Sequence, residues 1–171
     1  SVVIPSINFA ATANVLAACG AYPRFADIKS LTEPWLDPEA TEAGLKHGAR
    51  AVITVAYGGH PGEVRAIAAV AESHDAALIE DAAHGAGSWI EGQHVGTLGI
   101  AGGLSFSASK NLGVGEGGML LTSDPELAEL ARMLRFQGIT AQTADRDEEA
   151  VREYTVERPG FNYRTEDPRA A

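Results

Sequence analysis

The 171-residue sequence predicts an α/β fold in which helices cover both faces of a mainly parallel sheet. Short, continuous apolar runs alternate along most of the chain with stretches of helical spacing. Continuous apolar strands are typical of parallel sheets that are buried on both faces. The helical stretches are also long enough to carry the chain from one parallel strand to the next. A chain of this length fits one domain.

Six runs are expected to form strands because they are short and mostly apolar. They are "VVIP" at 2–5, "RFADI" at 24–28, "AVITVA" at 51–56, "AALIED" at 76–81, "GLSFS" at 103–107 and "GMLLTS" at 118–123. Four helices are expected within 11–20, 37–48, 62–75 and 124–138. Asp37 and Asp124 are N-cap residues, each followed by a proline at the first helical position. Gly20, Gly48 and Gly138 are expected to end helices.

From residue 139 onward the apolar pattern weakens. The segment "TAQTADRDEEAVREYTVERPG" is polar and charged and has no clear apolar period, which predicts a long loop or arm. The chain also starts inside an apparent strand and stops where a helix is beginning, so we expect it to be part of a longer protein.

Composition excludes several classes of partner. The net charge of -10 argues against binding to nucleic acid or to an anionic membrane. No segment has the length of a membrane span, and none resembles a secretion signal. Cys19 is the single cysteine, so no disulfide can form within the chain and a reducing, cytoplasmic location is expected. We expect the Cys19 thiol to be packed at the end of an apolar helix.

Polar residues converge at one rim of the expected sheet. Ligands of such sheets bind at the carboxyl ends of the strands, where Asp81 and His84 of "EDAAHGAGS" and Ser105 and Lys110 of "SFSASKN" fall. A lysine amine can bind an aldehyde, a carboxylate can keep a ring nitrogen protonated, and a hydroxyl can bind phosphate. Pyridoxal 5'-phosphate (PLP) requires all three groups.

Several blocks of the chain resemble a known family. They are "VVIPSINFAATANVLAACGAYPRFADI", "VAYGGHPGEVRAI", "EDAAHGAGSWIEGQHVGTLGIAGGLSFSASKNLGVGEGGMLLTSDPELA" and "GFNYRTEDPRAA". In this order they are similar to segments of the DegT/DnrJ/EryC1/StrS sugar aminotransferases, which are fold-type I PLP enzymes. The resemblance implies a large domain with a seven-stranded type of sheet, with its core at 1–138. Residues 139–171 would then be an arm and the start of a connection to a C-terminal domain.

The resemblance also implies the roles of individual residues. Lys110 would be the Schiff-base lysine and general acid/base, Asp81 the partner of the pyridine nitrogen, and Ser105 a phosphate ligand. His84 would lie near the ring or its 3-hydroxyl group, and Phe9 would stack on the ring. Asn162 would reach the phosphate in a neighbouring subunit, which implies a homodimer with shared active sites. Arg164 is a weaker candidate for a phosphate or substrate contact.

For the whole enzyme, the resemblance implies transfer of an amino group, from a donor such as glutamate, to a keto sugar carried on a nucleotide. The chain departs from the family pattern at Ala56, where some relatives have aspartate, and at Pro168, which disfavours the last helix. Since the upstream segment and the small C-terminal domain are missing, we expect this chain to be inactive alone.

Alternative roles remain open for the candidate residues. Asp81 could cap a helix, His84 could support other site residues, Phe9 could be a core residue, and Asn162 and Arg164 could order a loop.

Other site types fit the sequence less well. The glycines of "GVGEGG" follow Lys110 and precede a strand, unlike a nucleotide-binding loop. A serine hydrolase lacks its G-x-S-x-G motif, and Asp81 with His84 lacks the further ligands that a metal would need. A PLP-binding relative without transaminase activity, whether dehydratase-like, regulatory or structural, is the remaining alternative.

Overall fold

The computed structural model describes residues 1–139 and 155–164. The chain divides into two compact units, residues 1–123 and 124–171. The last expected helix therefore belongs to the second unit, and the expected large-domain core at 1–138 stays a prediction. Most of the expected polar arm, including Pro168, lies outside the described residues.

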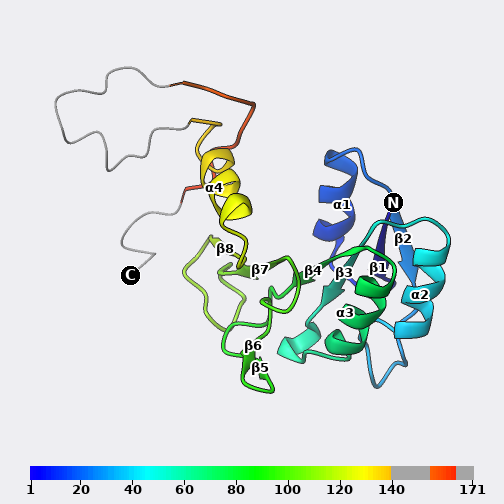
Figure 1. The fold of residues 1–171 in the computed structure, drawn as a ribbon. Coiled ribbons are helices and arrows are strands. Elements are labelled where there is room, and N and C mark those ends of the chain that lie inside the picture. Colours follow the sequence, from blue (N-terminus) through cyan, green and yellow to red (C-terminus); the bar gives the residue numbers. More distant parts are fainter. Residues whose placement is uncertain (140–154, 165–171) are drawn as a thin grey trace. The chain divides into compact units, whose positions relative to one another are not determined.

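The first unit contains one six-stranded sheet in the order β2-β1-β3-β4-β7-β8 (Figure 1). Its strands are β1 (Val2–Pro5), β2 (Pro23–Ala26), β3 (Ala51–Val55), β4 (Ala77–Asp81), β7 (Ala101–Ser105) and β8 (Gly118–Leu121). Neighbours from β2 to β7 pair in parallel, and β8 pairs with β7 in the antiparallel direction. The expected α/β class with a mainly parallel, mixed sheet is confirmed.

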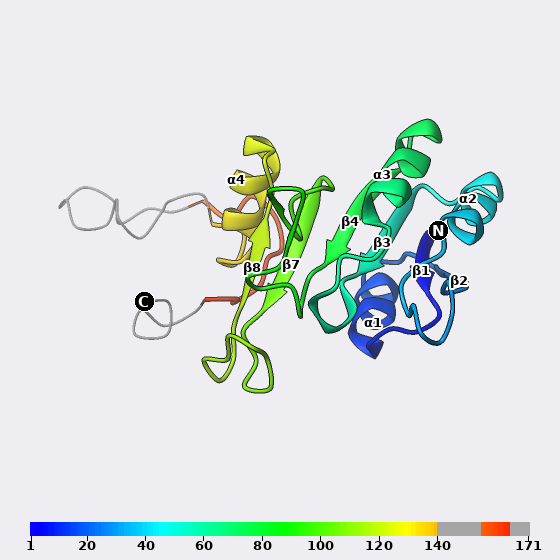
Figure 2. The ribbon, with the colours of Figure 1, turned by 90° about the horizontal axis from the view of Figure 1, so that it is seen from below.

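Alternate side chains of the strands point to opposite faces of the sheet. On one face Val3, Val52 and Leu78 form a buried cluster with residues of α2 (Pro38–Lys46) and α3 (Val64–Ser73). On the other face Ile4 and Ile53 pack with Leu16 of α1 (Ala10–Ala18). Figure 2 shows α1 on the opposite side of the strands from α2 and α3. Both faces are therefore covered at β1, β3 and β4, as their continuous apolar sequences predict.

The helix ends follow the expected sequence signals. The Asp37 carboxylate accepts hydrogen bonds from the backbone N–H groups of Glu39 (2.6 Å) and Ala40 (3.1 Å). At the end of α1, Gly20 has φ +69° and its N–H donates to the carbonyl of Ala17 at 3.0 Å. This left-handed residue is the usual way for a helix to satisfy its last carbonyls.

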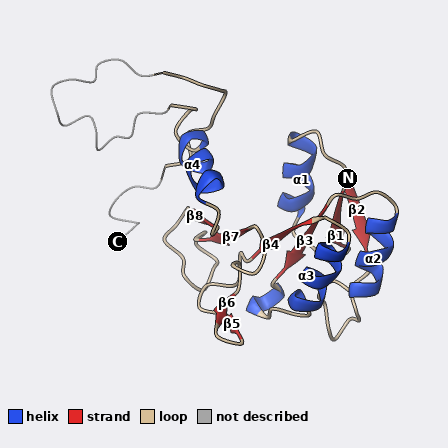
Figure 3. Ribbon diagram, in the orientation of Figure 1, coloured by secondary structure: helices blue, strands red, loops and turns tan. Residues whose placement is uncertain are grey.

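Three local features differ from the sequence-based expectations. β7 begins at Ala101, two residues earlier than expected. A small hairpin of β5 (Trp89–Ile90) and β6 (Gln93–His94) was not expected (Figure 3). Cys19 is exposed, so its expected packing is wrong. Cys19 is the C-cap residue of α1, and it is not part of the cluster in which Leu16 packs against the sheet.

A buried carboxylate fixes the chain just before β7. Glu80 is 3% exposed, and its two oxygens accept hydrogen bonds from the backbone N–H groups of Gly96 (2.8 Å), Leu98 (2.6 Å) and Gly99 (2.9 Å). Burying backbone N–H groups without hydrogen-bond acceptors costs free energy. The Glu80 oxygens supply these acceptors. It thereby holds the 96–99 turn against β4.

The described part of the second unit contains α4 (Pro125–Leu134), capped by Asp124, and the segment 155–164. The N–H of Gln137 donates to the carbonyl of Phe161 (2.7 Å), and the N–H of Phe161 donates to that of Leu134 (2.7 Å). These bonds pair residues 155–164 with the chain that follows α4, around an isolated bridge between Phe136 and Asn162.

Candidate active site

The carboxyl ends of β4 and β7 lie next to each other at one edge of the sheet. Asp81, the last residue of β4, pairs with Gly103, so Ser105 at the end of β7 lies two residues further toward the same edge. The backbone around Asp81 is fixed on both sides: its carbonyl accepts from the N–H of Ala56 (2.9 Å), and the N–H of Ala82 donates to the carbonyl of Gly103 (2.9 Å). The sheet therefore provides a rigid base for both side chains.

Hydrogen bonds orient the Asp81 carboxylate from two directions. Its Oδ1 accepts from the N–H of Ala83 at 3.0 Å, which is a local turn contact. Its Oδ2 lies 3.2 Å from the hydroxyl oxygen of Thr12, which comes from α1. No helix begins within 82–88, so the alternative that Asp81 caps a helix is wrong.

His84 lies on the turn after β4 and faces the loop after β3. The N–H of Gly58 donates to its Nδ1 at 3.2 Å, so this nitrogen is the acceptor and the neutral ring carries its proton on Nε2. The Tyr57 ring meets the imidazole edge-on, with 6.2 Å between the centroids. A Cβ on Gly59 would lie 2.9 Å from the carbonyl oxygen of His84, so only glycine lets the two loops come this close.

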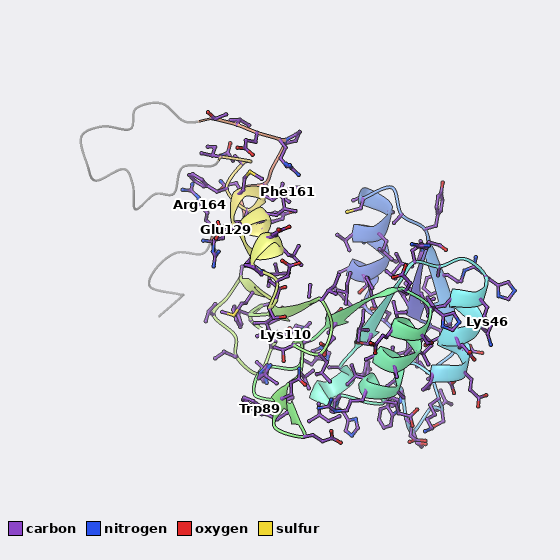
Figure 4. All side chains as sticks on the ribbon, viewed as in Figure 1. Lys46, Trp89, Lys110, Glu129, Phe161 and Arg164 are labelled. Carbon is purple, nitrogen blue, oxygen red and sulfur yellow. The ribbon has the colours of Figure 1, made fainter. Side chains whose placement is uncertain are left out.

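The lysine lies on a compact turn between β7 and β8 (Figure 4). The N–H of Lys110 donates to the carbonyl of Ser107 at 2.9 Å, and the N–H of Ser107 is 3.4 Å from the Ser105 hydroxyl oxygen. The side chain of Asn111 donates to the carbonyl of Ala86 at 2.8 Å. This bond ties the Lys110 loop to the turn that carries His84.

Lys110 differs from the other two lysines in its surroundings. Lys29 pairs with Glu63, and Lys46 pairs with Glu42. Within 1–139 and 155–164, the Lys110 ammonium has no carboxylate partner. A lysine that is half-buried on a small-residue loop and is not used in a surface ion pair is available for chemistry.

Phe9 lies immediately before α1, the helix whose Thr12 hydroxyl contacts Asp81. It has an extended backbone and is the N-cap residue of the helix, and its side chain is 79% exposed. The alternative that Phe9 is a core residue is therefore wrong. An exposed ring at this position is free to meet a planar ligand.

Asn162 and Arg164 belong to the second unit. The Arg164 Nε donates to Asn162 Oδ1 at 3.0 Å, and the guanidinium carbon lies 5.0 Å from the centroid of the Phe136 ring. Both side chains therefore contribute to the local order of this segment. Their expected contacts with phosphate or substrate stay predictions.

The groups at the sheet edge fit PLP in their chemistry. Asp81, Ser105, His84 and Lys110 supply a carboxylate, a hydroxyl, an imidazole and an amine from the ends of two adjacent strands and the loops that follow. A metal site fits less well, since no group of three or more potential ligands among His, Cys, Asp and Glu occurs in the described part of the chain. The same residues include no helix that is long and apolar enough to cross a bilayer.

Sequence reasoning missed Thr12, which contacts Asp81, and Asn8, which contacts Thr12. The Thr12 hydroxyl is 3.0 Å from Asn8 Oδ1 as well as 3.2 Å from Asp81 Oδ2. A threonine on an apolar helix gives no sign of its partner, because 69 positions separate it from Asp81. Only the pairing of β1 with β3 and of β3 with β4 brings the two residues together.

The chain matches one family model, and many solved structures are similar to it. The sequence model of the DegT/DnrJ/EryC1/StrS aminotransferase family matches residues 1–171. The aminotransferase TlmJ from Streptoalloteichus hindustanus is 37% identical, with a TM-score of 0.88 over 99% of this chain and 43% of its own. PseC from Helicobacter pylori, an aminotransferase involved in the biosynthesis of pseudoaminic acid, is 30% identical, with a TM-score of 0.85 over 96% of this chain and 42% of its own.

A third similar structure was solved with a sugar nucleotide. DesI, in the presence of its TDP-sugar product, is 37% identical, with a TM-score of 0.75 over 80% of this chain and 35% of its own. The chain thus spans less than half the length of each of these three structures.

Proposed function

Because the chain belongs to the DegT/DnrJ/EryC1/StrS aminotransferase family, we propose that the protein binds PLP and transfers an amino group to a keto sugar carried on a nucleotide. The observation that carries the proposal is the convergence of Asp81, Ser105 and Lys110 at one edge of the sheet. The sugar nucleotide bound to DesI supports the substrate class, and glutamate is the proposed amino donor.

Lys110 is proposed to anchor the cofactor and to move the proton. Its primary amine is the nucleophile that an aldehyde requires, and once free it can accept and return a proton as general acid/base. The compact turn at 107–110 and the Asn111 bond to Ala86 restrict where this amine can reach. When bound, PLP supplies an electron sink that stabilises negative charge at the carbon beside the transferred amine.

Asp81 is proposed to accept a hydrogen bond from the pyridine N–H. A carboxylate at this position favours the protonated ring, and bonds from Ala83 and Thr12 hold it in one orientation. Ser105 is proposed to donate to a phosphate oxygen. Since His84 Nδ1 already accepts from Gly58, its Nε2–H is the donor left for the 3-hydroxyl group of the ring.

Phe9 is proposed to cover one face of the ring and exclude water from it. Its side chain is exposed in this chain and comes from the segment next to Asn8 and Thr12. Stacking on the flat ring would bury apolar area on both partners.

The assembly proposed for the protein is a homodimer with shared active sites, in which Asn162 reaches the phosphate of the neighbouring subunit. Arg164 is proposed as a second contact in the same block. Because Cys19 is the single cysteine and no disulfide can form within the chain, a reducing compartment such as the cytoplasm is the proposed location. The chain alone is proposed to be inactive, since it spans less than half the length of its relatives.

Absorbance of the full-length protein with PLP tests the cofactor site. The wild type should show a visible band that Lys110→Ala abolishes. Lys46→Ala is the matched control, because Lys46 is a surface lysine paired with Glu42. A wild type without a visible band, or a band that survives Lys110→Ala, would refute the proposed site.

A second measurement separates an aminotransferase from a relative that only binds PLP. Glutamate added to the loaded protein should give 2-oxoglutarate, measured by a coupled dehydrogenase. A stable visible band without 2-oxoglutarate would favour the non-transaminating alternative.

A further inference from the structure

We propose that Asn8 and Thr12 form a directed hydrogen-bond relay that positions the Asp81 carboxylate toward the cofactor ring. The inference rests on the proposed function, because it assigns positioning residues to the same site. Thr12 lies in the first turn of α1 and is 6% exposed, and Asn8 lies one turn before it.

The Thr12 hydroxyl has one proton for two neighbouring oxygens. A threonine hydroxyl can donate one proton, yet Thr12 Oγ1 lies 3.0 Å from the side-chain oxygen of Asn8 and 3.2 Å from Asp81 Oδ2. An ionised carboxylate can only accept. The Thr12 proton therefore belongs on the bond to Asp81, which leaves two oxygens of Thr12 and Asn8 facing each other.

The Asn8 amide nitrogen is buried and has no hydrogen-bond partner among residues 1–139 and 155–164. Turning the amide by half a turn about its last bond exchanges its nitrogen and oxygen. The amide nitrogen then donates to Thr12 Oγ1, and the Thr12 hydroxyl donates to Asp81 Oδ2. This change removes the contact between two acceptor oxygens and gives the amide nitrogen an acceptor, while the amide oxygen takes the position that the nitrogen held.

Two donors hold the Asp81 carboxylate. Its Oδ1 accepts from the N–H of Ala83, while its Oδ2 accepts from Thr12, so each oxygen has one fixed donor. The carboxylate is then held from the turn after β4 on one side and from α1 on the other. Rotation about its side-chain torsion would break at least one of these bonds. Asn8 and Thr12 act through Asp81 and are positioning residues.

The burial of Thr12 supports this role. Its neighbours on α1 are apolar, and valine has the same shape without the hydroxyl. A buried hydroxyl without a role would carry a desolvation cost.

The test measures the dissociation constant for PLP in the full-length protein, using the visible band of the bound cofactor. Thr12→Val should raise the dissociation constant about fivefold to tenfold, the range expected for the loss of one hydrogen bond. Thr12→Ser keeps the hydroxyl and should stay within about twofold of the wild type. Asn8→Ala removes the first donor and should raise the constant about threefold.

A double-mutant cycle shows whether the effect passes through Asp81. In an Asp81→Asn background, Thr12→Val should change the dissociation constant by less than about twofold, because the acceptor that Thr12 orients is no longer a carboxylate. Equal effects in both backgrounds would overturn the relay, as would a Thr12→Val protein that binds PLP like the wild type. If Thr12→Val fails to fold, Asn8→Ala decides, and an unchanged constant for it refutes the relay. Failure of the proposed function looks different, because the wild type itself would then bind no PLP.

Discussion

The side chain of Asn111 donates a 2.8 Å hydrogen bond to the backbone carbonyl of Ala86, which links the residue after Lys110 to the turn after β4. This bond joins the loop between β7 and β8 to the turn after β4, and it does not involve the side chains proposed to contact PLP. We expect this bond to limit the positions that the lysine can take before any ligand binds.

Removing this contact should weaken cofactor binding. Asn111→Ala leaves the Lys110 loop less ordered, so the dissociation constant for PLP should rise about fivefold, as expected for one lost hydrogen bond. Titration of the visible band measures it. Asn14→Ala is a matched control, because Asn14 is exposed on α1 and has no side-chain hydrogen bond to the described residues. Equal effects of the two variants would contradict the role of Asn111.

Loss of the Glu80 charge should destabilise the first unit. Glu80→Gln replaces one acceptor oxygen with an N–H₂ group that faces backbone donors, at a cost of about 3 kcal/mol in the free energy of unfolding. Urea unfolding of the full-length protein measures this cost. Glu72→Gln, at the exposed end of α3, should change the stability by less than about 0.5 kcal/mol. A Glu80→Gln protein as stable as the wild type would show that the 96–99 turn does not need the carboxylate.

Two adjacent glycines of β7 should respond differently to alanine. A Cβ on Gly102 would lie 2.0 Å from the carbonyl oxygen of Gly96, whereas a Cβ on Gly103 would meet nothing within 4 Å. Gly102→Ala should therefore lower the free energy of unfolding by about 3 kcal/mol, and Gly103→Ala by less than about 0.5 kcal/mol. Thermal or urea unfolding compares the two. The interpretation fails if Gly103→Ala is the more damaging change.

The pKa of Lys29 should depend on Glu63. The hydrogen bond that the Lys29 ammonium donates to Glu63 is the main cause that raises the pKa of Lys29 above its ordinary value, with added attraction from Glu33 and Asp37. Because the folded-state pKa is raised above the ordinary lysine value, this pair contributes stability at neutral pH that is lost as the pH rises through the folded-state pKa. Glu63→Gln should lower the Lys29 pKa, as measured by NMR titration of the lysine side chain. An unchanged pKa would contradict the pairing.

The fold and the candidate site residues were predictable from the sequence, whereas the contacts that hold those residues were not. Apolar runs and caps such as Asp37 and Asp124 are local, so the sequence predicts the six strands and four helices to within a few residues. The β5–β6 hairpin was not predicted because its strands have only two residues each. Its turn is formed by Glu91 and Gly92, which both have positive φ, as is usual in tight hairpins.

Candidate site residues were identified by their position at strand ends, as for Asp81 and Ser105, or by resemblance, as for Phe9. The contacts of Thr12 with Asp81 and of Asn111 with Ala86 depend on strand order and loop approach, which a single sequence does not encode locally.

The strand order β2-β1-β3-β4-β7-β8 has a consequence for how the protein folds. The candidate site draws on segments near residues 8–12, 57–60, 81–88 and 105–111, which meet only after β1, β3, β4 and β7 have all paired. Closing these long loops is slow compared with forming the helices. PLP would therefore recognise only chains whose central strands have assembled. During refolding, PLP would bind only after the last of these strands has paired. Excess PLP would stabilise the native state but would not speed its formation.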